Sequence, residues 1–140
     1  MIGTNRGHYG LVALIYMAGN IEKKVSVKEV AEKENISKRY LEQIFSAMKK
    51  GGILISVKGS QGGYLLSRSP KEITVGDVLR SLEDIENPVP KNYSIEDISY
   101  TIQKEVWDSI DASINKIIES TSIEDLRNKH NENSANIYYI

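Results

Sequence analysis

The stretch at residues 51–66, GGILISVKGSQGGYLL, places five glycines and one lysine around two apolar runs. The segments ILISVK (53–58) and GYLLS (63–67) are typical of strands, and the glycines between them suit a turn with positive φ. A nucleotide-binding phosphate loop needs its glycines between a strand and a following helix, whereas these glycines join two strands. The stretch therefore predicts a β-hairpin with a slender tip.

Two helices are predicted near the start of the chain, before a third helix that directly precedes the hairpin. The run NRGHYGLVALIYMAG (5–19) has apolar residues at helical spacing and ends at a glycine, which is typical of an amphipathic helix. Ser26 and Glu29 have the spacing of a capping box for the next helix. That helix is expected to end near Asn35, because asparagine tolerates a left-handed conformation.

A third helix is predicted over SKRYLEQIFSAMKKGG (37–52), capped by a serine and closed by two glycines. Its apolar residues form one inward stripe, which leaves a polar edge outward near the start of the helix. Glutamine can pair with adenine, glutamate with cytosine, and lysine or arginine with guanine or phosphate. An ordinary solvated face is the alternative interpretation. The candidate base-reading residues are Ser37, Lys38, Arg39, Glu42 and Gln43.

The order helix, helix, tight turn, helix and glycine-tipped hairpin is that of a winged helix-turn-helix. Lys58, Ser60 and Gln61 lie at a hairpin tip narrow enough for a minor groove. The small residues there would let the backbone approach sugar and phosphate. After the hairpin, ITVGDVLRSLE (73–83) is expected to form a helix capped by Thr74.

The segment DIENPVPKNYS (84–94) carries two prolines and predicts a boundary. Beyond it, apolar residues recur every three or four positions from Ile95 to Ile117, which predicts one long helix with a single apolar seam. A small domain cannot cover such a seam, so self-association is the simplest interpretation. The residues assigned to dimerisation are Ile98, Ile102, Val106, Ile110, Ile114 and Ile117, with Trp107 and Ile118 widening the seam.

Charge is divided unevenly along the chain. Residues 1–82 carry 13 Lys and Arg against 7 Asp and Glu, whereas residues 83–140 carry 5 against 12. A basic first half suggests a polyanionic partner, although scattered solvated charge is the alternative. The absence of cysteine excludes disulfides and thiolate-bound metals, and the two histidines lie at opposite ends of the chain, so no metal site is expected.

Other classes are not favoured by the sequence. It has no paired histidine and carboxylate, no nucleophile motif and no metal cluster, so an enzyme is not expected. No apolar run approaches the roughly 20 residues of a membrane helix, and the first residues lack the apolar core of a signal peptide. We therefore expect a soluble cytoplasmic protein.

Four motifs resemble the Rrf2 family of bacterial transcription regulators: RGHYGL (6–11), ISKRYLEQIF (36–45), GGILISVKGSQGGYLL (51–66) and EITVGDVLRSLE (72–83). The resemblance implies a dimer of winged helix-turn-helix domains joined through a long carboxy-terminal helix. It places base contacts on the five residues given above. It also implies wing contacts by Lys58, Gly59, Ser60, Gln61 and Gly62, and phosphate contacts by Thr4, Asn5 and Arg6.

Many family members hold an iron–sulfur cluster on three cysteines after the winged domain, but this chain has none, so no cofactor is expected. Its second half, at residues 103–126 and 136–140, resembles a cluster-free subfamily that represses cysteine metabolism together with cysteine synthase (CysK, O-acetylserine thiol-lyase). The resemblance implies that this synthase binds the tail in its active site, whereas packing of the tail on its own domain is the alternative. The tail residues are Tyr138, Tyr139 and Ile140.

The sequence thus predicts a mostly α protein with a small β-hairpin. We expect a winged helix-turn-helix domain over residues 1–83, a linker and dimerisation helices over 84–126, and a flexible polar tail over 127–140. The predicted function is a homodimeric, DNA-binding repressor of cysteine and sulfur metabolism genes that acts with the synthase. The alternatives are an Rrf2-type repressor that responds to another signal, and a protein-interaction module that regulates the synthase.

Overall fold

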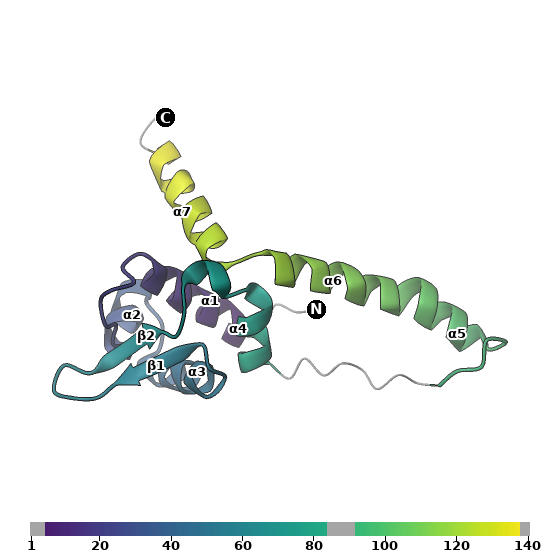
Figure 1. Ribbon diagram of the computed structural model, residues 1–140, viewed down its shortest axis with the longest axis horizontal. Coiled ribbons are helices and arrows are strands. Elements are labelled where there is room, and N and C mark those ends of the chain that lie inside the picture. The colour runs from purple at the N-terminus through teal and green to yellow at the C-terminus, as the bar shows by residue number, and fades with distance from the viewer. Residues whose placement is uncertain (1–4, 84–91, 138–140) are drawn as a thin grey trace.

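The computed structural model describes residues 5–83 and 92–137. These residues include a two-stranded antiparallel hairpin, and Figure 1 shows it at the edge of a group of helices, with one long helix and the last helix of the chain projecting away from them. A mostly helical protein with a small hairpin was the predicted fold class, and this prediction is confirmed. The elements are α1 (Asn5–Ala18), α2 (Val27–Glu34), α3 (Lys38–Lys50), β1 (Leu54–Val57), β2 (Gly63–Leu66), the 3-10 turn η1 (Pro70–Glu72), α4 (Val75–Leu82), α5 (Ile98–Ile102), the π-helical turn η2 (Gln103–Trp107), α6 (Asp108–Ser120) and α7 (Ile123–Ile137).

Local capping fixes where α2 begins and ends. The Ser26 hydroxyl accepts a hydrogen bond from the Glu29 backbone N–H at 3.1 Å, and Asn35 ends the helix with a left-handed φ of 54°. The capping box is only half formed, because the Glu29 carboxylate instead accepts a hydrogen bond from the Tyr16 hydroxyl at 2.6 Å. This hydrogen bond ties α1 to α2 and raises the pKa of Tyr16 to about 12.

The apolar core lies where α1, α2, α3, α4 and the hairpin meet. One stripe of α3 supplies its centre, with Leu41, Ile44, Phe45 and Met48 all fully buried. Leu14 of α1 is equally buried. Burying side chains of this size contributes about 1.5–3 kcal/mol each, so the stripe largely decides which face of α3 points outward.

The long helix predicted after residue 95 is confirmed, although it begins at Ile98. It runs through α5, η2 and α6 to Ser120, and the π-helical turn lies in its middle. Figure 1 shows it extending away from the other helices. Ile118, which we expected to widen the seam, is only 6% exposed, because it lies at the end of α6 that contacts α4.

The chain returns to the other helices through a short antiparallel bridge between Thr74 and Ser122. The backbone N–H of Val75 donates to the Thr121 carbonyl, and the N–H of Ile123 donates to the Ile73 carbonyl, both at 2.9 Å. The beginning of α7 then packs on α1. The long helix is therefore attached by backbone hydrogen bonds as well as by side chains.

The expectation of a loose tether was wrong for residues 127–136, because α7 continues through them to Ile137. The Ser122 hydroxyl accepts a hydrogen bond from the Asp125 backbone N–H at 3.0 Å, and the Asp125 carboxylate accepts one from the Ser122 N–H at 2.9 Å, which starts the helix. Ile123 is buried and anchors the first turn in the core. Packing and capping at one end therefore extend a helix into a segment whose composition alone favours a loop. Residues 138–140 lie outside the described residues.

A network of charged side chains joins the hairpin, α4 and α6. The Arg68 guanidinium, just after β2, donates to the Gly52 and Glu72 carbonyls and to the Asp77 carboxylate at 2.9 Å. Arg80 donates to Asp77 at 3.1 Å and to the Glu119 carboxylate of α6. The network therefore connects the end of α3, the end of the hairpin and the base of the long helix.

Asp77 is the central carboxylate of this network. Partial burial acts to raise its pKa, but the hydrogen bonds from the Thr74 backbone N–H and from Arg80 and Arg68 together lower the pKa below its ordinary value of 3.8. A pKa that is lower in the folded than in the unfolded state stabilises the fold at pH values above the unfolded-state pKa. This contribution is lost as the pH falls through the folded-state pKa.

We predict that Asp77→Asn lowers the free energy of unfolding by about 1–3 kcal/mol near neutral pH, because two arginines and a helix cap lose their charged acceptor. The difference from the wild type should shrink as the pH falls below 3.8. Urea unfolding at fixed protein concentration measures both. Asp111→Asn, at an exposed position of α6, serves as the control and should cost almost nothing. A difference that stays constant into strong acid would contradict the assigned role of Asp77.

Candidate nucleic-acid interface

The turn between α2 and α3 sets the position of the candidate recognition helix. Asn35 reverses the chain, and the Ser37 hydroxyl accepts a hydrogen bond from the Tyr40 backbone N–H at 3.3 Å to start α3. At the other end, Gly52 has a φ of 80°, which only glycine adopts easily. These local signals, together with the buried stripe of α3, confirm the predicted helix-turn-helix.

All five candidate base-reading residues lie on the exposed side of α3 or at its cap. The Lys38 ammonium lies 3.8 Å from the Glu42 carboxylate, and both side chains are more than half exposed. Such an exposed pair contributes little to stability, so either group is free to exchange its partner for DNA. Arg39, Glu42 and Gln43 also line a shallow hollow along this face, together with Ser46 and Lys50.

The candidate wing is the loop at residues 58–62 between β1 and β2. The strands pair from Leu54 opposite Leu66 to Val57 opposite Gly63, so the predicted hairpin is confirmed. All five loop residues are exposed. Gly59 has a φ of 129°, and a Cβ at Gly62 would lie 2.6 Å from the Val57 carbonyl oxygen. The loop can therefore stay this narrow only with glycine at these two positions.

Sequence reasoning missed a third strand-like segment at the base of the wing. Val25 and Tyr64 form an antiparallel bridge, with backbone hydrogen bonds of 3.0 and 2.8 Å. The Tyr64 ring also packs edge-on against Phe45 of α3, with 5.0 Å between ring centroids. These contacts hold the wing and the recognition helix in a fixed relative orientation. One bridging valine between Lys24 and Ser26, directly before a predicted helix, gives no strand pattern that could have revealed the bridge.

The beginning of α1 lies next to the beginning of α3. Tyr9 and Tyr40 make an edge-to-face contact with ring centroids 5.8 Å apart. Asn5 and Arg6, predicted to contact phosphate, are exposed in the first turn of α1. Thr4, the third residue of that prediction, lies outside the described residues. The structure thus brings the described part of this group to the same side as the start of the recognition helix.

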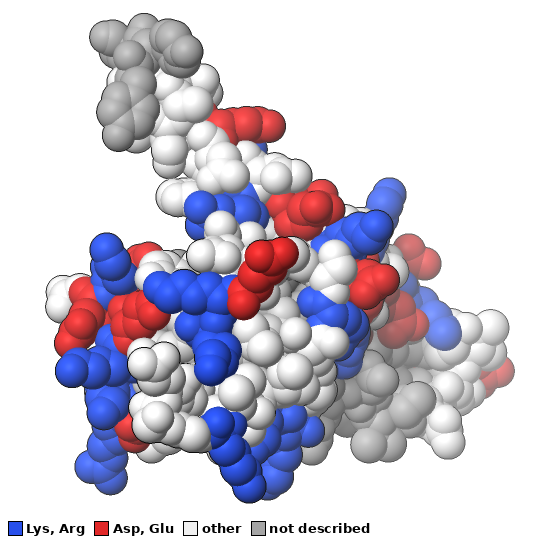
Figure 2. Space-filling model, turned by 60° about the vertical axis from the view of Figure 1, so that its left-hand side comes forward, with Lys and Arg blue, Asp and Glu red and all other residues white. Residues whose placement is uncertain are grey.

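Lys50 is a candidate that the sequence analysis did not include. It lies seven residues after Gln43, so two helical turns place the two side chains on one face of α3. This spacing is visible in the sequence, but Lys50 lies near the end of the helix, whereas base contacts were expected near its start. Figure 2 shows Lys and Arg side chains gathered over the lower part of the body, with Asp and Glu more frequent toward the top of the view.

These elements define the class of the protein as a winged helix-turn-helix. A family model described as "Rrf2: Iron-dependent Transcriptional regulator" matches residues 3–129. The chain belongs to the Rrf2 family, and it is a DNA-binding transcriptional regulator. The family resemblance inferred from the four motifs is confirmed, as is the expectation that the protein is not an enzyme, since its relatives are named as transcriptional regulators.

Relatives differ in how much of the chain they match. The HTH-type transcriptional regulator CymR of Bacillus subtilis is 34% identical over 139 residues, which is 98% of each chain. The regulator IscR of Cronobacter sakazakii is 38% identical over 82 residues, 58% of this chain and 51% of that relative. The solved structure of CymR, titled the global cysteine regulator of B. subtilis, has a TM-score of 0.77 and 33% identity, covering 91% of this chain and 96% of that one.

The family description mentions iron, so the available ligands matter. The sequence contains no cysteine, and within residues 5–83 and 92–137 no group of three His, Asp or Glu side chains could hold a metal ion. A thiolate-bound iron–sulfur cluster therefore does not fit the residues of this chain. Within the same two ranges, no helix is both long and apolar enough to cross a membrane.

The recognition helix and the wing of the candidate interface should respond differently to mutation. We predict that Gln43→Ala weakens binding to a duplex selected from random sequence by about 1–3 kcal/mol and relaxes the preference at one base pair. Lys58→Ala should weaken binding to selected and to random DNA alike. It should also make the slope of log K against log salt less steep by about the amount that one phosphate contact contributes. Fluorescence anisotropy over a salt series measures both.

The matched control is Lys129→Ala, which removes an exposed lysine from α7 and should leave both quantities unchanged. Equal losses on selected and random DNA for Gln43→Ala would contradict base reading by that side chain.

Proposed function

We propose that the protein is a homodimeric repressor of cysteine and sulfur metabolism genes that acts together with cysteine synthase CysK. The observation that carries this proposal is the extent of similarity: CymR matches 98% of the chain, whereas IscR matches 58% of it. The similarity to CymR therefore includes the long helix and the segment after it. A shared second half favours a shared mode of regulation beyond a shared DNA-binding domain.

In this proposal, α3 reads bases in the major groove and the wing contacts the adjacent groove. The exposure of the α3 edge and the narrow glycine loop support this arrangement. A symmetric dimer would bind a palindromic operator with half-sites one or two helical turns apart. The proposed DNA contacts are Thr4, Asn5, Arg6, Ser37, Lys38, Arg39, Glu42, Gln43, Lys58, Gly59, Ser60, Gln61 and Gly62.

Dimerisation would use the apolar seam of the long helix. In the isolated chain Ile98 is 81% exposed and Ile117 is 64% exposed, while Ile102, Val106 and Ile110 are each 40% exposed or more. Ile114 is half-buried. Exposing so many apolar side chains along one helix to water is energetically unfavourable, and such a pattern is typical of an interface between helices. A second copy of the same helix offers a matching surface.

The proposed organisation has three parts. Residues 1–83 form the winged helix-turn-helix domain, residues 84–126 contain the linker and dimerisation helices, and residues 127–140 form the partner-binding part. The helical course of α7 changes the expected character of the third part but not its proposed role. Tyr138, Tyr139 and Ile140 follow this helix and are proposed to enter the active site of the synthase, as an extended peptide enters a pocket.

We predict that Ile110→Asp dissociates the dimer, because it places an unpaired carboxylate in the apolar seam. Sedimentation equilibrium should show a monomer, and circular dichroism should show unchanged helical content. The fold should persist because this side chain is 45% exposed in the single chain and is not needed in its core. Ala112→Asp adds the same charge on the opposite face of α6 and should remain dimeric. A dimeric Ile110→Asp variant would place the interface elsewhere.

We predict that deleting Tyr139 and Ile140 abolishes binding to cysteine synthase while leaving DNA binding by the free regulator intact. Isothermal titration with purified synthase measures the first, and anisotropy on selected DNA measures the second. O-acetylserine in excess should release the full-length chain, because both would occupy the same active site. Unchanged synthase affinity after the deletion would contradict the tail mechanism. If the full-length chain binds the synthase but shows no salt-dependent DNA binding, the alternative of a protein-interaction module would be favoured.

A further inference from the structure

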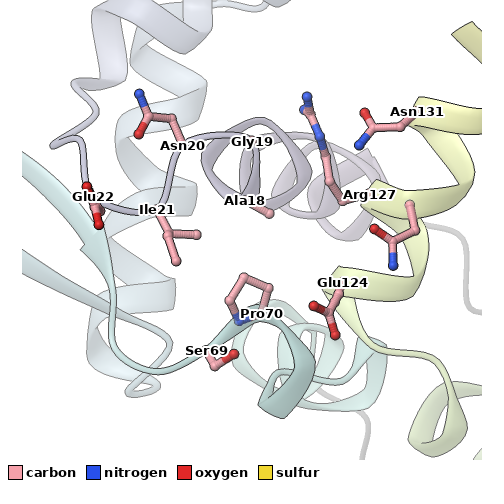
Figure 3. Close-up of a pocket in the computed structure, with 11 residues that line it drawn as sticks. Ala18, Gly19, Asn20, Ile21, Glu22, Ser69, Pro70, Glu124, Arg127 and Asn131 are labelled. Atoms are coloured by element: carbon pink, nitrogen blue, oxygen red, sulfur yellow. The ribbon is translucent and has the colours of Figure 1, made fainter. Parts of the chain in front are cut away.

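A pocket of about 460 Å³ lies between the end of α1, the turn η1 and α7 (Figure 3). None of its lining residues belongs to α3, to the wing or to the apolar seam. Its volume is in the range that small-molecule sites occupy. Ala18, Ile21 and Pro70 contribute carbon surface, whereas Asn20, Glu22, Ser69 and the side chains of α7 contribute polar and charged groups. The pocket therefore combines a small apolar surface with polar groups on both sides.

Arg127 of α7 is the cation of this pocket. Its guanidinium donates to the Ile15 carbonyl at 3.3 Å, and it makes no ion pair with any residue in the part of the chain that the structure describes. Its Nε atom is buried and has no hydrogen-bond partner. A partly desolvated guanidinium without an anion is costly. A carboxylate placed beside it would accept two parallel charged hydrogen bonds.

Glu124 lies one helical turn before Arg127 and lines the same pocket (Figure 3). The two side chains do not form an ion pair with each other, although they have opposite charges and suitable helical spacing. Figure 3 shows the Asn131 side chain beside Arg127, while Glu124 lies nearer to Pro70. The pocket thus presents a cation and an anion on α7 that do not pair with each other, with Glu22 on the opposite wall.

We propose that this pocket binds a small α-amino acid. Its carboxylate would pair with Arg127 and Asn131, its ammonium group with Glu124, and its short side chain would contact Ala18, Ile21 and Pro70. A ligand with a single charge would leave either Arg127 or Glu124 unsatisfied. A zwitterion satisfies both at once, which gives the site its selectivity.

The walls of the pocket connect this ligand to the position of α7. Ala18 and Pro70 belong to α1 and η1, whereas Arg127 and Glu124 belong to α7. Gly19 leaves room for the Arg127 guanidinium over the end of α1, since a Cβ there would lie 2.7 Å from it. A ligand that contacts both walls would stabilise the docking of α7 on α1 by mass action.

The test uses the full ¹⁵N-labelled chain and amide chemical shifts. The probes are glycine, L-alanine, L-serine and L-threonine, with propionate and ethylamine as single-charge analogues. At least one amino acid should shift the signals of residues 18–22 and 124–131 with saturation below about 10 mM. Propionate and ethylamine should bind at least about tenfold more weakly. The proposal fails if none of the four amino acids saturates, or if propionate binds as well as they do.

Glu124→Gln is the decisive variant, because its side chain is exposed and the fold does not depend on its charge. It should weaken amino-acid binding about tenfold or more while leaving propionate binding unchanged. Arg127→Gln should abolish both. Lys129→Gln removes a charge from the same helix outside the pocket and should change neither. Wild-type amino-acid affinity in Glu124→Gln would overturn the assigned zwitterion site.

Discussion

Burial of the α3 stripe is the constraint on which the rest of the structure depends. Leu41, Ile44, Phe45 and Met48 point into the core with no exposed surface, which fixes the rotation of the helix about its axis. The polar edge from Ser37 to Gln43 faces outward as a consequence. The same buried stripe meets the wing through the Phe45–Tyr64 contact, so the core and the proposed DNA-reading surface are two sides of one helix.

The charged network around Asp77 connects that reading surface to the long helix. Arg68 holds the carbonyl at the end of α3, and Arg80 reaches Glu119 near the base of the projecting helix. The backbone bridge between Thr74 and Ser122 reinforces the same junction. In a dimer formed through the long helices, these contacts would set the angle and spacing of the two recognition helices, which must match the operator.

The exposed seam and the pocket beside α7 represent two different kinds of unsatisfied surface. The seam is apolar, and in the proposed dimer a second copy of the helix would remove it from water, which would stabilise the dimer by about 25 cal/mol per Å² of apolar surface. The pocket contains separated charges, which a small zwitterion would neutralise. Because the two surfaces lie on different parts of the chain, assembly and ligand binding are able to respond to different signals.

The sequence by itself determined the local features of this protein. Helix caps at Ser26, Ser37 and Thr74, and the hairpin with its narrow tip, follow from interactions within a few residues of the chain. Only the tertiary structure decided the Val25–Tyr64 bridge, the helical course of residues 127–137 and the pairing of Arg80 with Glu119. The bridge and the ion pair join segments far apart in sequence, where no short-range pattern specifies the partner, whereas α7 forms because burial of Ile123 and the cap at its start override local propensity.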